Sequence, residues 1–449
     1  MSTGHGRRAS AGARSAAAVK IAESRTQRNG TILQKPTLPG PLAIVSRFGP
    51  ILGARFARAN LDILRQAHAA YTGLRKAKII RGRAANIFTQ WIGDPDALGS
   101  AVVLKAMLEH LGAKEVRILT GALGHPQTRN LAERCHIVLQ DPNADRLPRG
   151  LHCMVDTSPP LGMTNTGRVE PVSEYFFVAD HHAELADVEE NCRDRGVKRV
   201  RLPFVGIPVG STSAFVAVIA AAFGLLDELG PEGRAAAALG IYTDTSALLH
   251  AATPLDFRMF ELLTQDEATR DILDELRDYR VPPEWYVYRA AAVQNLEMRG
   301  SIRIAPVGYV REDLRDVIAE IANDLLRIEN TSIGIAVAVT ERGTEVSVRA
   351  DSRLLGNDQS RIVRVIDHLL SYAFPGLSGF KHERRPPHRV EGGACVPHSQ
   401  ASDRLWKPGA TGPGRGDPVL EHCRACAQAL IAALEDLKFA RPEEIEGLL

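Results

Sequence analysis

The residues that most clearly indicate chemistry are Asp180, His181 and His182, which follow an apolar run at 175–178. The run predicts a buried strand. An acid and two imidazoles do not end a strand for packing reasons, because these groups need water, a charged partner or a metal. Carboxylate and neutral imidazole together are a common ligand set for divalent transition metals. The alternative is a solvated turn with two incidental histidines.

Acidic residues also follow three other segments that lead toward one edge of the predicted sheet. They are Asp94 and Asp96 after a strand at 85–89, Asp156 at the end of a strand at 152–156, and Asp244 at the end of 240–243. In open α/β sheets, ligand groups gather beyond the carboxyl ends of the strands. Any one of these acids could instead cap a helix. Because four segments converge and one carries a double histidine, the set predicts a metal site.

The elements that must position these residues alternate between strand and helix. Strands are predicted at 85–89, 115–119, 152–156 and 175–179, and helices at 101–111, 128–135, 212–226, 233–240 and 254–264. Such alternation is typical of βαβ units around a parallel sheet. We therefore expect an α/β domain over 84–280.

A second, smaller α+β domain is predicted over 300–449, after a linker at 281–299 that contains Pro282 and Pro283. Its predicted elements are a strand at 301–307, a helix at 311–327, a hairpin of 333–339 with 345–350, and a helix at 361–370. The stretch 376–418 is rich in Pro, Gly and His and has little periodicity, so we expect irregular structure there. A closing helix is predicted at 422–438.

The N-terminal part of the chain is strongly basic. Residues 1–83 carry 16 Lys and Arg against two acids, Glu23 and Asp62. We expect a disordered basic arm over 1–40 and a helical basic extension over 41–83, with Leu61, Leu64, Ala67 and Tyr71 on one apolar face. Such an arm could bind nucleic acid, or it could be a solvated tail beside a helix packed on the first domain.

Composition narrows the class of protein. The 449 residues are 45% hydrophobic and 24% charged, as in ordinary soluble globular proteins. Six cysteines in a chain of this length do not make a disulfide scaffold. The longest apolar run, 214–226, suits a buried helix and is too short to span a bilayer. We expect a cytoplasmic protein without a membrane partner.

Four motifs occur in order along the first domain. They are Ile92-Gly93-Asp94-Pro95-Asp96-Ala97-Leu98-Gly99-Ser100, Val155-Asp156-Thr157-Ser158, Asp180-His181-His182 and Gly240-Ile241-Tyr242-Thr243-Asp244-Thr245, followed by Thr253-Pro254-Leu255-Asp256-Phe257. With these motifs the chain resembles the DHH/DHHA1 phosphoesterase superfamily, which includes RecJ-like exonucleases, oligoribonuclease/pAp phosphatases and cyclic-dinucleotide phosphodiesterases. The resemblance runs from about residue 84 to the C-terminus and is strong over the first domain.

The resemblance implies an active-site cleft between the two domains that holds two Mn²⁺ ions, with Mg²⁺ or Co²⁺ as substitutes. It implies metal ligands at Asp94, Asp96, Asp156, His181 and Asp244, with Asp156 bridging the ions. Asp180 would support the site, His182 would face the substrate phosphate, and Arg349, Gly392 and Gly393 would bind the substrate. Two such ions clamp the attacking and leaving oxygens of a phosphoester and activate a water molecule.

The chain departs from the family pattern at two positions. Gln90 stands where the family has its first histidine, a ligand to one metal, and Ala394 stands where the family's Gly-Gly-His motif ends, after Gly392 and Gly393. The expected function is hydrolysis of a phosphodiester or phosphomonoester in a nucleotide or short oligonucleotide. The alternatives are a catalytically weakened or inactive nucleotide-binding sensor that uses the same cleft, and a nucleic-acid adaptor that works through the basic arm. A homodimer is compatible with each.

A separate group of residues has the spacing of a structural zinc site. Cys395 and His398 form a Cys-x-x-His pair, and Cys423 and Cys426 form a Cys-x-x-Cys pair at a predicted helix start. A Zn²⁺ ion there would support a segment with little periodicity. The alternative is incidental thiols in a loop and a helix.

Overall fold

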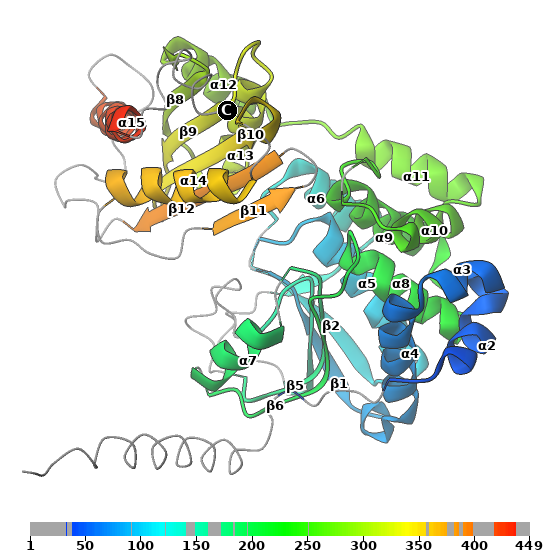
Figure 1. Cartoon of the computed structure of the whole chain (residues 1–449). Helices are drawn as coiled ribbons and strands as arrows, with labels where there is room; N and C mark the ends of the chain where they lie inside the picture. The colour runs from blue at the N-terminus through cyan, green and yellow to red at the C-terminus, as the bar shows by residue number, and fades with distance from the viewer. Residues whose placement is uncertain are drawn as a thin grey trace, which may run out of the picture.

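The computed structural model describes residues 33, 38–90, 92–121, 123–140, 149–159, 172–182, 185–194, 196–249, 251–355, 359–374, 381–385, 389–397 and 417–436. The predicted arm over 1–40 therefore lies outside the described residues, apart from Leu33 and 38–40. Figure 1 shows two layered units, the second of which contains the later part of the chain.

The first domain is built on a parallel six-stranded sheet with the order β3-β2-β1-β4-β5-β6. The strands are β1 (Ala84–Phe88), β2 (Glu115–Leu119), β3 (Leu139–Gln140), β4 (Leu151–Val155), β5 (Glu174–Asp180) and β6 (Arg199–Val205). The strand order reverses between β1 and β4, which makes the carboxyl ends of these strands the place where such sheets bind ligands. The predicted parallel α/β sheet is confirmed.

Helices cover both faces of this sheet. One face packs against α5 (Pro95–His110) and α8 (Thr212–Phe223), with α6 (Pro126–Arg134) and α9 (Gly230–Asp244) packed on these helices, and α7 (Leu185–Asp194) covers the other face. Two further helices, α10 (Pro254–Leu263) and α11 (Glu267–Arg277), extend the helical layer. The segment 240–243, interpreted from sequence as leading into the sheet edge like a strand, is instead the last turn of α9. Asp244 therefore reaches the site from the end of a helix.

Glycines allow α5, α8 and α9 to approach one another closely. A Cβ atom at Gly99 would lie 2.6 Å from the carbonyl oxygen of Ala236 in α9. A Cβ atom at Gly240 would lie 2.5 Å from Ser213 Oγ and 2.9 Å from the Cα atom of Asp96. The absence of side chains at these two positions therefore sets the distance between the helices that carry the acids.

The N-terminal extension is helical, as predicted. It comprises α2 (Pro41–Leu52), α3 (Ala54–Ala59), α4 (Leu61–Lys76) and the short 3₁₀ helix η1 (Lys78–Ile80). Leu64, Ala67 and Tyr71 are buried where α4 packs on α8 (Figure 1). Arg47 stacks over the Tyr71 ring, 4.5 Å from its centre. The extension thus adds a helical layer to the first domain.

The second domain is a mixed sheet between two pairs of helices. Its strand order is β11-β12-β10-β9-β8-β7, from β7 (Glu297–Arg299), β8 (Ile302–Tyr309), β9 (Ile333–Val339), β10 (Gly343–Asp351), β11 (Lys381–Arg385) and β12 (Arg389–Pro397). One face packs on α12 (Pro283–Gln294) and α13 (Val317–Leu326), which η2 (Glu312–Leu314) precedes. The other packs on α14 (Gln359–Ala373), which follows η3 (Ser352–Leu355), and α15 (Pro418–Asp436). The predicted α+β domain is confirmed.

Two segments differ from the sequence-based expectation. The predicted linker at 281–299 contains α12 and β7, because Pro282 and Pro283 begin a helix rather than interrupt the fold. Trp285 in α12 is completely buried against α13. The stretch at 376–418, expected to be irregular, contributes β11 and β12 to the sheet.

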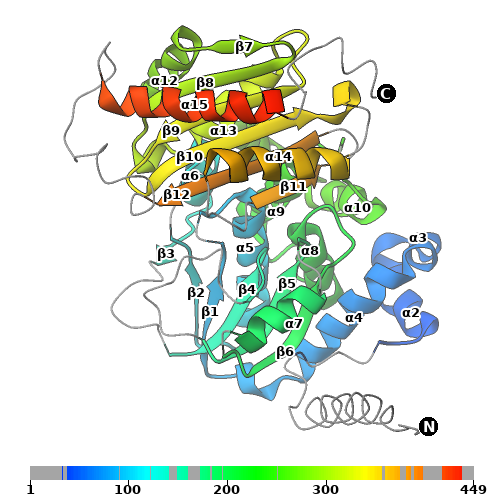
Figure 2. The ribbon, with the colours of Figure 1, turned by 60° about the vertical axis from the view of Figure 1, so that its left-hand side comes forward.

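The two domains touch beside α6. Arg129 in α6 donates a hydrogen bond to the carbonyl of Asp313 in the second domain (3.0 Å). A Cβ atom at Gly124 would lie 2.6 Å from a carboxylate oxygen of Asp316, so the two segments meet closely there. In Figures 1 and 2, β11 and β12 lie on the side of the second domain that faces the first. Within the described residues, no helix combines the length and hydropathy that crossing a membrane requires.

Candidate metal centre

Asp156 occupies the position directly after β4 with an unusual backbone. Its φ angle is +57°, a left-handed conformation that is uncommon for a residue with a side chain but tolerated by Asp and Asn. Its amide donates to the carbonyl of Ala179 (2.8 Å), and its Oδ1 accepts from Thr212 Oγ1 (3.0 Å). Oδ2 is buried and accepts no hydrogen bond from the residues that the structure describes. A buried carboxylate oxygen of this kind is a candidate cation ligand.

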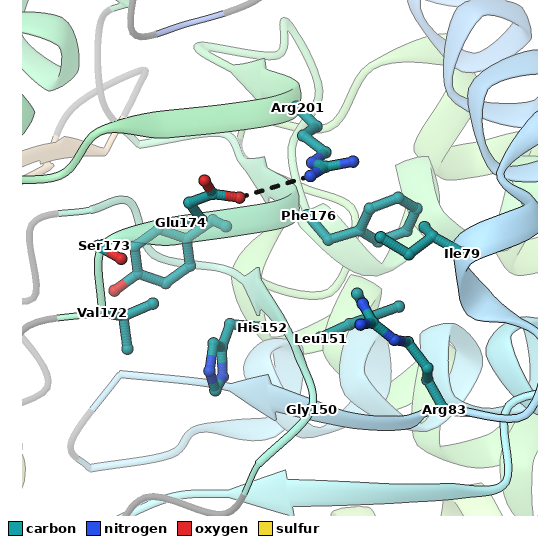
Figure 3. A pocket seen from close by; sticks show the side chains of 11 residues that line it. Ile79, Arg83, Gly150, Leu151, His152, Val172, Ser173, Glu174, Phe176 and Arg201 are labelled. Atoms are coloured by element: carbon teal, nitrogen blue, oxygen red, sulfur yellow. Dashed lines mark hydrogen bonds and ion pairs between the residues drawn. The ribbon is translucent and has the colours of Figure 1, made fainter.

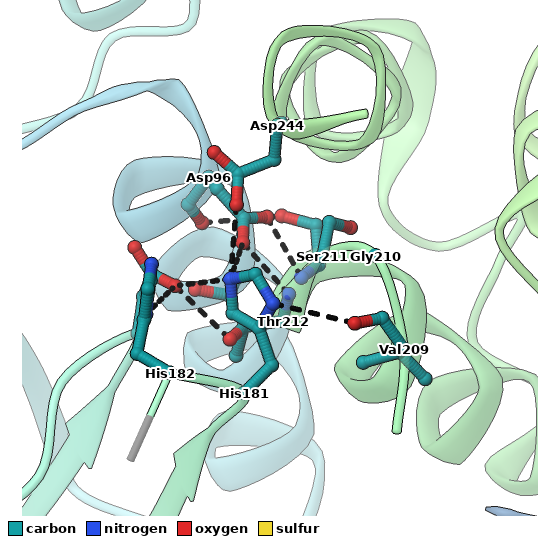
Figure 4. A network of polar contacts seen from close by, with 12 residues as sticks. Asp96, His181, His182, Val209, Gly210, Ser211, Thr212 and Asp244 are labelled. Carbon is teal, nitrogen blue, oxygen red and sulfur yellow. Dashed lines mark hydrogen bonds and ion pairs between the residues drawn. The ribbon is translucent and has the colours of Figure 1, made fainter. Parts of the chain in front are cut away.

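His181 stands at the end of β5 with its Nε2 atom turned toward three acids (Figure 4). The distances from Nε2 are 2.9 Å to Asp244 Oδ2, 3.6 Å to Asp156 Oδ1 and 4.0 Å to Asp96 Oδ2. The other ring nitrogen, Nδ1, donates to the carbonyl of Val209 (3.3 Å). This hydrogen bond selects the tautomer whose Nε2 lone pair can bind a metal among the acids.

Asp180 holds the neighbouring histidine. Its Oδ1 accepts from both the backbone amide and the Nδ1 atom of His182, each at 3.0 Å, and its Oδ2 accepts from Ser158 Oγ. Burial by itself would raise the pKa of Asp180, but the hydrogen bonds from His182 and Ser158 hold it below the ordinary value. Asp180 is therefore an ionised partner that orients His182.

Asp96 is fully buried and joins two helices. Its Oδ2 accepts from the amide of Thr212 (2.7 Å) and its Oδ1 from the amide of Ser213 (2.8 Å), at the start of α8. Burial raises its pKa to about 7, and the nearby charge of Asp244 adds to the shift. Asp96 therefore belongs to the site and also anchors α8.

Asp94 and Gln90 interact directly. Asp94 caps α5 through a hydrogen bond from the amide of Ala97 to its Oδ1 (2.9 Å). Its Oδ2 accepts a hydrogen bond from the side-chain amide of Gln90. Gln90 is thus placed directly against the acid that begins α5.

The acids crowd one another in a buried volume. The pKa of Asp156 lies well above its ordinary value because of burial and the charges of Asp96 and Asp94. Burial would lower the pKa of His181, but the hydrogen bond and charge of Asp244 raise it to about 10. The negative charge of the acids holds this proton on His181. A bound divalent cation would neutralise the same charge.

Asp256 fixes the loop that faces His181. It is buried, its Oδ2 accepts from the amides of Gly210 (2.8 Å) and Thr253 (2.7 Å), and its Oδ1 accepts from the amide of Ser211 (3.1 Å). Sequence reasoning identified Asp256 as part of a motif without this role. It did not identify Val209, Thr212 or Ser213, although Ser211 and Thr212 before an apolar run are a helix N-cap signal.

The residues present fit a metal ion. One ligand atom from each of Asp156, His181, His182 and Asp244 lies within 4.8 Å of the others. This set offers carboxylate oxygen and imidazole nitrogen, which suits a divalent transition metal. Of the five metal ligands implied by the sequence resemblance, Asp156, His181 and Asp244 belong to this cluster, Asp96 borders it, and Asp94 lies beside Gln90.

The substrate-binding residues suggested in the second domain lie within or beside β12. Arg349 in β10 donates to Asn323 Oδ1 (3.0 Å) and lies 3.5 Å from Glu391 Oε2. Gly392 and Gly393 pair with β10 on one side and β11 on the other. A Cβ atom at Gly393 would lie 2.7 Å from the carbonyl oxygen of Val346. A role for these residues in substrate binding remains a prediction.

The suggested zinc ligands do not form a cluster among the described residues. Cys423 and Cys426 lie in the apolar core of the second domain. Burial raises the pKa of Cys423 to about 12 and that of Cys426 to about 11, as expected for thiols in an apolar core. His398 lies outside the described residues. The described groups that could hold a metal include neither thiol.

A cavity of about 360 Å³ opens at the opposite end of the sheet, where β4 and β5 begin. Figure 3 shows Arg83, His152, Glu174 and Arg201 around it, with Arg201 and Glu174 3.5 Å apart. Burial lowers the pKa of His152. This cavity is separate from the carboxyl ends of the strands that carry Asp156 and Asp180.

Comparisons with known proteins bear on the fold. No family model matches the chain. Among curated proteins, an uncharacterized protein of Methanocaldococcus jannaschii is 25% identical over 273 residues, which cover 60% of this chain and 52% of that protein. The chain thus spans about half the length of the curated relative that it matches.

Two solved structures match most of the chain. The DHH domain of a member of a family of ribosomal proteins covers 85% of this chain and 95% of its own, at 12% identity and a TM-score of 0.28, which is too low to bear on the fold. An exopolyphosphatase-related protein from Bacteroides fragilis covers 82% of this chain and 97% of its own, at 12% identity and a TM-score of 0.51. The chain therefore shares the fold of this exopolyphosphatase-related protein.

Proposed function

We propose that the chain is a metal-dependent phosphoesterase of the DHH/DHHA1 superfamily that hydrolyses a phosphodiester or phosphomonoester of a nucleotide or short oligonucleotide. The observation that carries the proposal is the cluster of Asp156, His181, His182 and Asp244 at the reversal point of a parallel sheet. Mn²⁺ is the proposed ion, with Mg²⁺ and Co²⁺ as substitutes, because the ligand set is rich in oxygen.

The residues of the chain have separate tasks in this proposal. Asp156, His181 and Asp244 would hold the metal, which when bound polarises a phosphoryl oxygen and lowers the pKa of a water molecule. His182 would bind the substrate phosphate. Burial would lower the pKa of His182, but its hydrogen bond to Asp180 raises it, so the ring can carry a proton to donate to an anionic oxygen. With Nδ1 bound to Asp180, the Nε2–H group is the donor available to the substrate.

The second candidate is a nucleotide-binding sensor without turnover. It is favoured by the hydrogen bond from Gln90 to Asp94, because a histidine at position 90 would offer a metal-binding nitrogen instead. Nucleic-acid binding through the basic arm is a further proposal. The packing of α2–α4 on the first domain favours the structural alternative for residues 41–83.

A substrate panel separates these candidates. Purified protein with saturating Mn²⁺ would be incubated with pAp, di- to pentanucleotides, cyclic dinucleotides and long single strands, and products would be quantified by chromatography. The proposal expects hydrolysis of at least one short substrate and its loss in His182→Ala and Asp244→Asn. Nucleotide binding with no hydrolysis of any substrate would establish the sensor and overturn the enzymatic proposal.

A further inference from the structure

We infer that the centre of this chain binds one divalent ion rather than a pair, and that Gln90 and Asp94 close the second metal position by bonding to each other. This inference rests on the proposed metal site and specifies its composition. It follows from where the hydrogen-bond donors and acceptors around the two metal positions are placed.

The first metal position keeps its ligands. His181 Nε2 faces Asp244 Oδ2 at 2.9 Å and Asp156 Oδ1 at 3.6 Å, while Val209 holds the ring from the other side. Asp96 borders this group at 4.0 Å. Three residues therefore supply two carboxylates and one imidazole, a donor set sufficient for a divalent ion that completes its coordination with water or substrate.

The second position would need Asp94, and both oxygens of Asp94 already accept hydrogen bonds. Oδ1 accepts from the amide of Ala97 at the start of α5, and Oδ2 accepts from Gln90 Nε2. The lone pair of an amide nitrogen is delocalised onto the carbonyl group and is not available to a metal, so the NH₂ group acts only as a donor. A hydrogen-bond donor thus stands where a histidine at position 90 would offer a metal-binding nitrogen.

The orientation of the Gln90 amide is set by its partner. Turning the amide around would place its oxygen against Asp94 Oδ2, where two acceptors would repel each other. The nitrogen therefore remains toward the carboxylate, and its hydrogen bond stabilises the negative charge of an acid that a metal would otherwise bind. Even with the amide reversed, its neutral oxygen would replace the stronger imidazole donor.

Metal stoichiometry tests the inference without using activity. Metal-stripped protein would be titrated with Mn²⁺ by calorimetry, and the loaded protein examined by electron paramagnetic resonance. The parent should bind one Mn²⁺ per chain and give the spectrum of an isolated ion. Gln90→His should bind two and show the exchange coupling of a close pair. Asp244→Asn in the parent should lower the affinity for the single ion by at least about tenfold.

Asp94→Asn is the matched control, since Asn also caps helices well and should preserve the start of α5. In the parent it should leave the stoichiometry at one, and in the Gln90→His background it should reduce two ions to one. Two coupled ions in the parent would overturn the inference, as would a single ion in Gln90→His protein that melts at the parent's temperature. A parent that binds one ion and hydrolyses nothing would contradict the proposed function alone, whereas a hydrolase with two ions would contradict only the inference.

Discussion

Asp156 contributes to the centre through its backbone as well as its carboxylate. Because Asn tolerates a positive φ and can accept the hydrogen bond from Thr212, Asp156→Asn should retain the local fold while removing the charge. We expect Mn²⁺ affinity to fall at least about 100-fold, since removing even a hydrogen-bond partner of a metal ligand costs about 10–100-fold. Calorimetric titration measures this. An unchanged dissociation constant in a variant that melts like the parent would contradict a ligand role.

Removing the side chain of Asp256 should lower both the stability of the protein and the metal affinity of the centre. Asp256→Ala would leave the buried amides of Gly210 and Ser211 without an acceptor and should cost about 2–4 kcal/mol in the free energy of unfolding. Mn²⁺ affinity should also fall, because the adjacent carbonyl of Val209 orients His181.

The matched control for Asp256 is Asp266→Ala, which removes the N-cap of α11 at the protein surface. It should cost only about 1 kcal/mol and leave metal affinity unchanged. Urea denaturation and Mn²⁺ titration of both variants provide the measurements. Equal metal affinity in the two variants would remove Asp256 from the support of the site.

Some residues of this centre can be predicted from their type. Others cannot, because they come together only through contacts between segments far apart in the chain. Asp156 and His181 could be predicted because a buried strand rarely ends on such groups without a chemical reason. The hydrogen bonds from Thr212 and Ser213 to Asp96 join residues more than a hundred positions apart, and no periodic pattern in the sequence indicates them. The same holds for Asp256, whose type suits an ordinary helix cap.

The helix packing around Asp96 depends on a missing side chain in α9. Gly240→Ala would press a methyl group against Ser213 Oγ and Asp96 Cα, so it should cost about 1–3 kcal/mol despite the better helix propensity of alanine. It should also weaken Mn²⁺ binding by displacing Asp96. Gly233→Ala, on the same helix with its nearest contact at 3.2 Å, should have a smaller effect. Urea denaturation with and without Mn²⁺ compares them; equal losses in both variants would contradict the packing argument.

The elements that were predicted correctly carry a strong local pattern. β1, β2, β4 and β5 have short apolar runs that read as strands. β6 was not predicted, since Arg199, Arg201 and Pro203 interrupt its apolar pattern and suit an edge strand. α12 was missed because prolines that begin a helix and prolines in a linker look alike in sequence.

At the scale of the whole molecule, the junction between the domains should be sensitive to acid. His125 lies between the rings of Tyr279 and Trp285, with centroids 4.8 and 5.5 Å away, and its Nδ1 accepts from the amide of Gln127. Burial, with a smaller effect of the Arg129 charge, lowers the pKa of His125 to about 4. His125 therefore takes up a proton near pH 6.5 in the unfolded chain but only at a lower pH in the folded protein.

The pH dependence follows from that difference. The contribution of His125 to the free energy of unfolding is fully present above pH 6.5 and is lost as the pH falls toward 4, by at most about 3 kcal/mol. His125→Asn keeps a capping residue that does not titrate, so its stability should fall less over this range. Urea denaturation at a series of pH values measures both proteins. Parallel curves would show that His125 is not responsible.

The burial of Leu33 has a consequence for solubility. Leu33 forms a parallel bridge with Val200, on the outer side of β6, and is 1% exposed in the core beneath α7. It therefore occupies part of the hydrogen-bonding edge that an open sheet would otherwise offer to another molecule. Removing residues 1–37 should uncover this edge and promote self-association, visible by light scattering as species that grow with protein concentration. Leu33→Ala, which keeps the backbone in place, should remain as monodisperse as the parent. In the truncated chain, Arg199, Arg201 and Pro203 of β6 would be left to oppose edge-to-edge pairing.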